Sequence, residues 1–277
     1  MNPKTPITFV LNEGSLVDVA RVRYALYDEP PFDEAIALLF HEQLEDGGFS
    51  PPWAPGYSSL DATCFRLAQA QQMGLDPSFL PPIGKALDFI LSQQGRDGGF
   101  QEEAFVAEVA PRWLTPGDNA ATMYLTANCS FALSMFGAPE GKVQLGAGYL
   151  QLRQTAEGNL PSFWQTQWLA AAVWHRVGGG KWRDQVLRYL ALNLDQLAAS
   201  NLAWMINALI SAGMKPSTVL IYEAAKRLEK QQNQFGTWSG ENDDARDMNT
   251  TIEALRALRL VGRYTPPPMN QLDWAGV

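Results

Sequence analysis

The stretch Gln-Gly-Arg-Asp-Gly-Gly-Phe, residues 94 to 100, determines the fold because it recurs along the chain. A close match, Gln-Leu-Glu-Asp-Gly-Gly-Phe, begins at Gln43, and weaker copies begin at Gln154 and Gln232. The interval between the last two is long enough to hold one more copy, and a degenerate one begins at Asn193. Recurrence at such intervals is typical of folds built from repeated helical hairpins.

Each copy predicts the same local structure. One helix ends at the Gln, a glycine provides the positive φ that turns the chain out of the helix, and a second helix follows a polar loop. Residues suited to N-caps precede the second helices, namely Ser58-Ser59, Gly117-Asp118, Pro161-Ser162, Ser200-Asn201 and Asp247. We expect the first helices at residues 32–42, 83–94, 142–153, 181–194 and 217–232, and the second at 62–73, 119–136, 163–177, 202–212 and 248–261. Residues 17–27 look like a sixth member of the second set.

The two sets of helices differ in polarity. Residues 226–230, Lys-Arg-Leu-Glu-Lys, are amphipathic and charged, whereas residues 168–174, Trp-Leu-Ala-Ala-Ala-Val-Trp, are apolar on every side, as in a buried helix. This alternation predicts two concentric rings of helices, an all-α fold in which residues 1–277 form a single α/α barrel domain. A linear solenoid is the competing layout, but it would leave the apolar set half exposed.

Composition excludes several classes of function. The chain has 277 residues, and its formal net charge of −8 disfavours nucleic acid as a partner. Two cysteines, Cys64 and Cys129, cannot form a disulfide framework. Because no apolar run reaches the roughly 18 residues of a spanning helix, we expect a cytoplasmic protein; peripheral membrane contact through a local patch stays open.

The repeat resembles the QW-type repeat of the terpenoid cyclase and protein prenyltransferase superfamily, over residues 32 to 261. The resemblance implies an α/α toroid in which the Gln and the aromatic residue stitch consecutive hairpins together and are structural. It also implies that chemistry takes place inside the mouth of the barrel, where the inner helices begin.

Squalene–hopene-type class II cyclases of this superfamily carry Asp-x-Asp-Asp-Thr-Ala-Glu at that place, and its middle Asp protonates an alkene. The best match here is residues 247–255, but Asn249 occupies the donor position, and an amide has no acidic proton to give. In a second aligned segment, which starts at Asp118, Ala120 occupies that position; in a third, Asp61 does. The candidate acids are therefore Asp61, then Asp247, then Asp118. Glu241, Asp243 and Asp244 form a further acidic run, which we interpret as a solvated loop.

The prenyltransferase branch binds zinc through an Asp-x-Cys pair and a distant His. Here Asp61 and Cys64 are three residues apart rather than two, and neither His41 nor His175 matches the position of the family's His. We therefore expect no metal and no cofactor. The cysteines are expected to pack as small apolar side chains.

Aromatic side chains are the second functional signal, because π faces stabilise cations. Trp164 and Trp204 lie in the first turns of inner helices and are the better candidates for lining the barrel; Trp168 and Trp113 are further candidates, and core filling is the alternative for each. Arg112 and Asn249 complete the candidate binding residues. Arg112 could hold a diphosphate, or pair with Glu102, Glu103 or Glu108.

Together these features predict a terpenoid cyclase-like enzyme that cyclises an isoprenoid by protonation in the barrel cavity. The alternatives are a non-catalytic toroid that binds an isoprenoid or a protein partner, and a prenyltransferase-like subunit. Polysaccharide cleavage lacks support, since no carboxylates pair at a recognisable spacing. A single barrel has an open mouth, so we expect a homodimer or a partner subunit to close it.

Overall fold

The computed structural model describes residues 4–76, 80–240 and 247–272, and this part of the chain contains twelve α-helices and no β-strand. Its only ladder pairings are the isolated bridges Gln43–Phe49 and Phe49–Ser59. The all-α prediction is therefore confirmed. Contacts within the chain fall into two compact units, which are described in turn.

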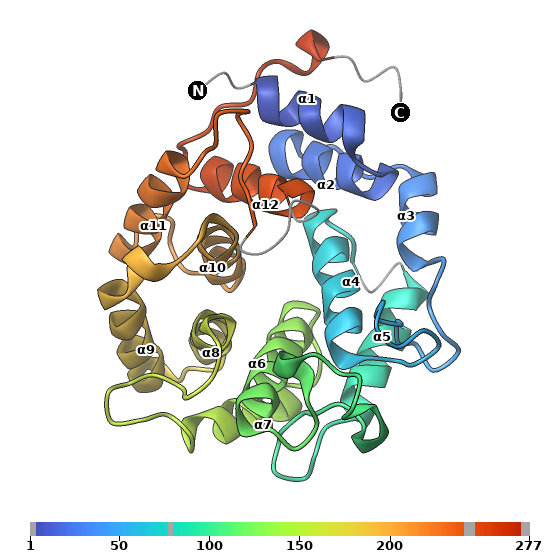
Figure 1. Ribbon diagram of the computed structural model, residues 1–277, viewed down its shortest axis with the longest axis vertical. Helices are drawn as coiled ribbons and strands as arrows, with labels where there is room; N and C mark the ends of the chain where they lie inside the picture. Colours follow the sequence, from blue (N-terminus) through green and yellow to red (C-terminus); the bar gives the residue numbers. More distant parts are fainter. Residues whose placement is uncertain (1–3, 77–79, 241–246, 273–277) are drawn as a thin grey trace. The chain divides into compact units, whose positions relative to one another are not determined.

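One unit comprises residues 40–71 and 75–192. Its helices are α4 (Leu60–Gln72), α5 (Pro81–Ser92), α6 (Asn119–Met135), α7 (Glu140–Gln151), α8 (Trp164–Arg176) and α9 (Gly180–Leu192). The apolar helices α6 and α8 pack against each other, and each also packs against the more polar helix that follows it, α7 and α9 (Figure 1). Every boundary lies within two residues of the one that the repeat predicted.

The other unit comprises residues 1–39, 72–74 and 193–277. Its helices are α1 (Lys4–Glu13), α2 (Leu16–Tyr27), α3 (Asp33–Phe40), α10 (Ala199–Ser211), α11 (Val219–Lys230) and α12 (Asp247–Leu260). Helix α12 contacts both α2 and α10, and α11 packs against α10 (Figure 1). Helix α1 was not expected from the sequence. Its Ile7 and Val10 are completely buried, because α1 packs against α2 and α12.

The repeat glutamines link each turn to the next hairpin. The side-chain amide of Gln94 donates to the carbonyl of Gly98 in its own turn, at 3.4 Å, and to that of Lys142 in the first turn of α7, at 2.9 Å. Gln43 bonds in the same way to Gly47 and Pro82, and Gln154 to Gly158 and Trp182. One amide therefore binds carbonyls on two segments at once, which is the stitching role expected for these residues.

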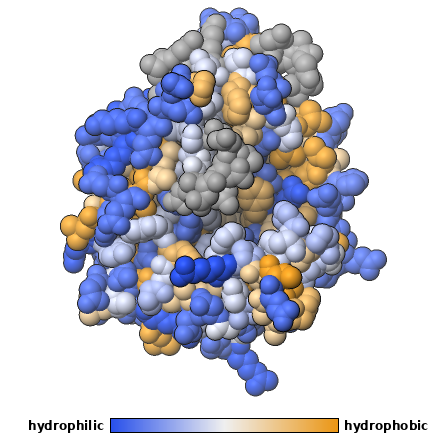
Figure 2. All heavy atoms as spheres, in the orientation of Figure 1, coloured by the Kyte–Doolittle hydropathy of each residue, from blue (hydrophilic) through white to orange (hydrophobic). Residues whose placement is uncertain are grey.

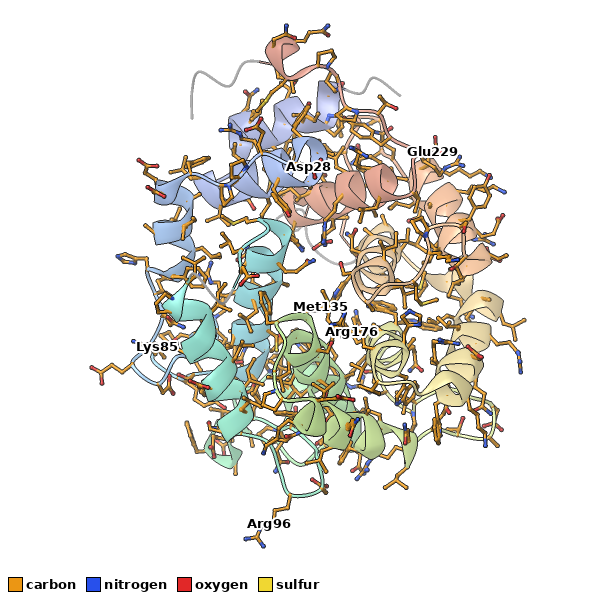
Figure 3. All side chains as sticks on the ribbon, turned by 180° about the vertical axis from the view of Figure 1, so that it is seen from behind. Asp28, Lys85, Arg96, Met135, Arg176 and Glu229 are labelled. Atoms are coloured by element: carbon orange, nitrogen blue, oxygen red, sulfur yellow. The ribbon has the colours of Figure 1, made fainter. Side chains whose placement is uncertain are left out.

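The first glycine of each copy allows this close approach. Gly98 has a φ of 91°, and a Cβ atom there would lie 2.3 Å from the carbonyl oxygen of Leu145 in α7. In the last copy, Gly236 has a φ of 79° and lies against Thr5 of α1. Helix α1 thus packs against the turn at Gly236 in the way that α7 packs against the turn at Gly98. By contrast, Arg96 between Gln94 and Gly98 extends into solvent (Figure 3).

The expected helix caps are only partly present. Asp118 caps α6 by accepting a hydrogen bond from the Ala121 N–H at 2.8 Å, and Ser59 caps α4 by accepting from Ala62 at 3.3 Å. The Ser162 and Ser200 expectations were wrong: the N-caps of α8 and α10 are the non-polar residues Phe163 and Ala198, which make no side-chain cap.

The surface of the described residues is mixed in character. Hydrophilic residues cover most of the face shown in Figure 2, with hydrophobic ones in separate small patches. Among the described residues, no helix is both long and apolar enough to cross a membrane.

We predict that the stitching residues stabilise the fold. Gln94→Ala should lower the free energy of unfolding by about 1–3 kcal/mol, because two carbonyls lose their donor. Phe100→Ala should lower it by about 3–5 kcal/mol, since Phe100 is fully buried. Denaturant unfolding provides the measurement. Gln93→Ala is the control, because the Gln93 amide donates only to the neighbouring Ser92 hydroxyl; equal losses for Gln93 and Gln94 would contradict the stitching role.

A pair of glycine variants tests the close approach. Gly98→Ala should destabilise the protein by about 2 kcal/mol or more, because positive φ strains alanine and its Cβ would clash with the Leu145 carbonyl. Gly148→Ala should instead stabilise it by about 0.5–1 kcal/mol, because Gly148 lies inside α7 with open space around it. Thermal melts of both variants decide the matter, and shifts of the same sign would refute this account.

Candidate active site

A recurring hydrogen bond shows which inner-helix residues are equivalent. The backbone N–H of the repeat aromatic donates to a threonine hydroxyl: Phe49 to Thr63 at 3.0 Å, Phe100 to Thr126 at 3.0 Å and Trp238 to Thr251 at 3.2 Å. Two residues before these threonines stand Asp61, Tyr124 and Asn249. The sequence alignment that placed Ala120 at this position is therefore wrong by one helical turn, because it used Thr122 in place of Thr126.

Asp61 lies in the first turn of α4 and is surrounded by hydrogen-bond donors. The Tyr124 hydroxyl donates to its Oδ1 at 2.7 Å, and the Asn128 amide donates to the same oxygen at 3.1 Å. Both donors lie on one face of α6, one turn apart. The Trp113 side chain also hydrogen-bonds the carboxyl group. The structure thus brings together two residues predicted from sequence, Asp61 and Trp113.

The surroundings of Asp61 make it a weaker acid than an ordinary carboxyl group. The pKa of Asp61 is raised from 3.8 to about 6. Desolvation is the largest cause and the charge of Glu102 adds to it, while the hydrogen bonds from Tyr124, Asn128 and Trp113 act in the opposite direction. The side chain still keeps some exposed surface. Asp61 is therefore an acid that holds its proton up to about pH 6 and whose conjugate base has donors already in place.

Two neighbouring groups of the site, Tyr124 and Cys129, remain protonated. Burial raises the pKa of Tyr124 well above its usual range, and the charge of Asp61 raises it further. Burial likewise raises the pKa of Cys129, whose Sγ lies 3.8 Å from that of Cys64. Both thiols are buried and unoxidised. Tyr124 is thus a permanent donor to Asp61, and a nucleophilic thiolate is disfavoured at Cys129.

Glu102 holds the N-terminal end of α4. Its carboxylate is buried and accepts from the Ser59 hydroxyl at 2.7 Å, the Tyr57 hydroxyl at 2.8 Å and the backbone N–H groups of Leu60 and Asp61 at 3.2 and 3.4 Å. The alternative that Glu102 pairs with Arg112 was therefore wrong, since its acceptor sites face α4. Arg112 itself is exposed, in a short 3₁₀ helix with Trp113.

The remaining aromatic candidates have different surroundings. Trp164 stacks on Tyr189 of α9, with ring centroids 5.9 Å apart. Trp168 is completely buried, so in this structure its ring belongs to the core and presents no surface to a ligand. Phe163, which precedes α8, meets Tyr124 edge to face at 6.2 Å. Of the three predicted tryptophans in this unit, Trp113 is the one that reaches the acid.

One candidate in the other unit, Asn249, belongs to a largely buried polar network. Asn249 accepts a hydrogen bond from the Arg21 guanidinium at 2.7 Å, and Arg21 also donates to Gln72 at 2.6 Å and to Asp18 at 3.0 Å. Glu253 accepts from Gln72 and from an amide of α10. Asn249 is thus held by a structural cation, and Trp204 is partly buried in α10.

The other two candidate acids, Asp118 and Asp247, are not shown in surroundings like those of Asp61. Asp118 is exposed and serves as the N-cap of α6, a role that accounts for an Asp at this position. Helix α12 begins at Asp247, but the surroundings of that side chain are not among the described features. Glu241, Asp243 and Asp244 lie outside the described residues. Within the described ranges, no three His, Cys, Asp or Glu side chains gather into a group that could hold a metal ion.

Sequence reasoning missed Tyr124, Asn128 and the role of Glu102. The threonine follows the aromatic by 14 residues in the first copy and by 13 in the last, but by 26 in the second. The long segment between α5 and α6 conceals the equivalence of Tyr124 and Asp61. The spacing of Tyr124 and Asn128 on one helical face was the signal that could have identified them as a pair.

Comparison with known proteins supports the fold. No protein-family model matches the chain, and no curated protein does. Among solved structures, a protein from Actinoplanes has a TM-score of 0.61 at 19% identity, with 89% of this chain and 90% of that chain covered. The type II terpene cyclase MstE from Scytonema, as a variant in complex with geranylgeranyl dihydroxybenzoate, has a TM-score of 0.59 at 15% identity, with 89% and 86% covered. Its ligand-free form has a TM-score of 0.57 at the same identity, with the same shares covered.

These similarities extend over most of each chain, whereas the sequences have diverged too far to carry an activity across. The repeat in the sequence had predicted the same fold. The chain has the terpene cyclase-like α/α toroid fold.

Proposed function

We propose that the protein is a type II terpene cyclase-like enzyme, which starts cyclisation by protonating a carbon–carbon double bond of an isoprenoid. Asp61 is the proton donor. The observation that carries this proposal is the combination, in one carboxyl group, of a raised pKa and neutral donors directed at one of its oxygens. Such an acid keeps its proton up to about pH 6, and the carboxylate left after proton transfer has hydrogen-bond donors already in place.

The proposed reaction is an isomerisation, because the proton that the substrate gains is matched by one that it loses. The Asp61 proton adds to one alkene carbon, and the π electrons of that alkene form the new C–H bond. The cation left on the other alkene carbon is attacked by the next double bond, which closes a ring. Loss of a proton from a carbon beside the last cation gives the product and regenerates the acid through solvent.

The residues around Asp61 have distinct roles in this proposal. Tyr124 and Asn128 stabilise the carboxylate as it forms, since hydrogen bonds to an anion are stronger than those to a neutral group. Trp113 and Phe163 provide π faces near the acid, which favour cations over water. The substrate class, a linear isoprenoid, is proposed from the fold and from this chemistry. Arg112 at the exposed end of the same segment is the candidate for an anionic head group.

A non-catalytic binding protein is the second candidate. It is favoured by Asn249, which stands at the position equivalent to Asp61 and accepts from Arg21 instead of donating a proton. In this alternative the Asp61 cluster would be a polar ligand contact. A homodimer or partner chain that closes the barrel mouth, and contact with a membrane surface, remain predictions under either candidate.

Replacement of the acid tests the function. Asp61→Asn should reduce turnover of linear isoprenoids, offered with and without diphosphate, by about 10²–10⁴-fold, the usual contribution of a general acid. Asp118→Asn is the matched control, because asparagine caps helices as well as aspartate does. Cyclised products can be measured by gas chromatography with mass detection. Equal activity in parent and Asp61→Asn protein, or no product from the parent, would leave the binding function.

The pH dependence of turnover should follow Asp61. Because the active form is protonated, the parent should be most active below about pH 6 and lose activity roughly tenfold per pH unit above it. A profile that rises through pH 6 to 8 would show that a base, and not this acid, limits the reaction.

The raised pKa also predicts a pH-dependent stability. The folded protein binds the Asp61 proton more tightly than the unfolded chain does, so this group costs stability as pH rises from about 4 to above 6. The difference in unfolding free energy between Asp61→Asn and the parent should shift by on the order of 3 kcal/mol, in favour of Asp61→Asn, between pH 4 and pH 8. Chemical unfolding at both pH values measures it, and a pH-independent difference would contradict the raised pKa.

A further inference from the structure

A second buried carboxylate lies beside the proposed acid. Only 3% of the Glu102 surface is exposed. Its two oxygens accept from hydroxyls of Tyr57 and Ser59 and from the backbone N–H groups of Leu60 and Asp61. The group therefore joins the segment before α4, the first turn of α4 and the segment after α5.

These hydrogen bonds do not require Glu102 to carry a charge. Ser59 already caps Ala62, and the remaining N–H groups of Leu60 and Asp61 could be satisfied by a neutral acceptor. Burial of a carboxylate costs free energy that is usually offset by a cation, yet no ion pair in the described part of the chain includes Glu102. A buried charge held only by hydroxyls and amides raises the question of what it acts on.

We propose that Glu102 is a positioning residue for Asp61: its carboxylate fixes the first turn of α4 and places a negative charge beside the acid. This inference rests on the proposed function, in which Asp61 gives up a proton. Glu102 touches the backbone of Asp61 and no reacting atom, so it acts through Asp61 alone.

Within residues 4–76, 80–240 and 247–272, four titratable groups interact with Asp61 or with its partner Tyr124. Glu102 approaches it from the segment after α5, Tyr124 and Cys129 from α6, and Cys64 from α4 itself. Burial raises the pKa of Tyr124 and of Cys129, so these two are neutral between pH 5 and 8. Glu102 is thus the charged neighbour through which the protonation of Asp61 can be changed.

Two variants separate charge from position. Glu102→Gln keeps the shape and an acceptor oxygen but removes the charge, whereas Glu102→Ala removes both. Glu103→Gln is the matched control. Glu103 is exposed, and it bonds to Tyr57 through its backbone N–H, which the substitution keeps. The primary measurement is the carboxyl ¹³C titration of Asp61 in protein labelled with ¹³C-aspartate, with the signal assigned by its absence in Asp61→Asn. Circular dichroism melts check folding, and turnover is measured across pH.

In Glu102→Gln, the Asp61 titration midpoint should fall by roughly 0.5–1 pH unit, because a negative neighbour is lost, and the loss of turnover at higher pH should begin lower by the same amount. Glu103→Gln should titrate like the parent. Glu102→Ala should also lower kcat at the optimal pH more than Glu102→Gln does, because the first turn of α4 is released. If Glu102→Ala does not fold, the Glu102→Gln titration decides.

An unchanged Asp61 titration in Glu102→Gln would overturn the inference. A shifted titration in a protein that makes no cyclised product would instead refute the proposed catalysis and leave Glu102 as the group that sets the charge of Asp61. The two failures are thus distinguishable, because the titration needs no substrate.

Discussion

The hydrogen bond between the backbone N–H of Phe100 and the hydroxyl of Thr126 fixes the relation between each turn and the helix that follows it. The same bond joins Phe49 to Thr63 and Trp238 to Thr251. Because a helix places residues two positions apart on different faces, fixing the threonine also fixes the direction of the side chain that precedes it by two. The position of Asp61 is therefore set by the repeat itself, before any functional requirement acts on it.

Much of the fold could be predicted from sequence, because the information is local. Gln94, Gly98 and Phe100 each have a role that follows from nearby chain geometry: a side-chain amide that reaches two carbonyls, a positive φ, and a buried ring. Helix α1 was missed because what supports it is not local. It precedes the first repeat in sequence, and it packs against α12 and against the turn at Gly236, more than 200 residues away.

The candidate site was predictable only in part, for the same reason. Asp61 could be identified because its spacing to Thr63 is short and lies within one helix. Tyr124 and Asn128 could not, because the segment between α5 and α6 has a length that no rule of the repeat determines. Glu102 was considered only as a possible partner of Arg112, since nothing in its neighbouring sequence shows that its partners are Tyr57 and Ser59, more than 40 residues earlier.

The three equivalent positions, Asp61, Tyr124 and Asn249, have the same place in the repeat but different roles. Each presents a polar side chain, but the surroundings decide what that side chain does. Asn249 faces the buried Arg21, where an amide oxygen satisfies the cation and adds no charge of its own. Tyr124 supplies a phenol that stays protonated, so it can only donate to Asp61. Asp61 is desolvated and has a negative neighbour, and both favour the protonated carboxyl group over the opposing effect of its neutral donors. A cation placed like Arg21 beside Asp61 would hold it ionised and remove its capacity to donate a proton. The functional difference between the positions therefore depends both on the residue that occupies each one and on the sign of the charge that the neighbouring segment brings to it.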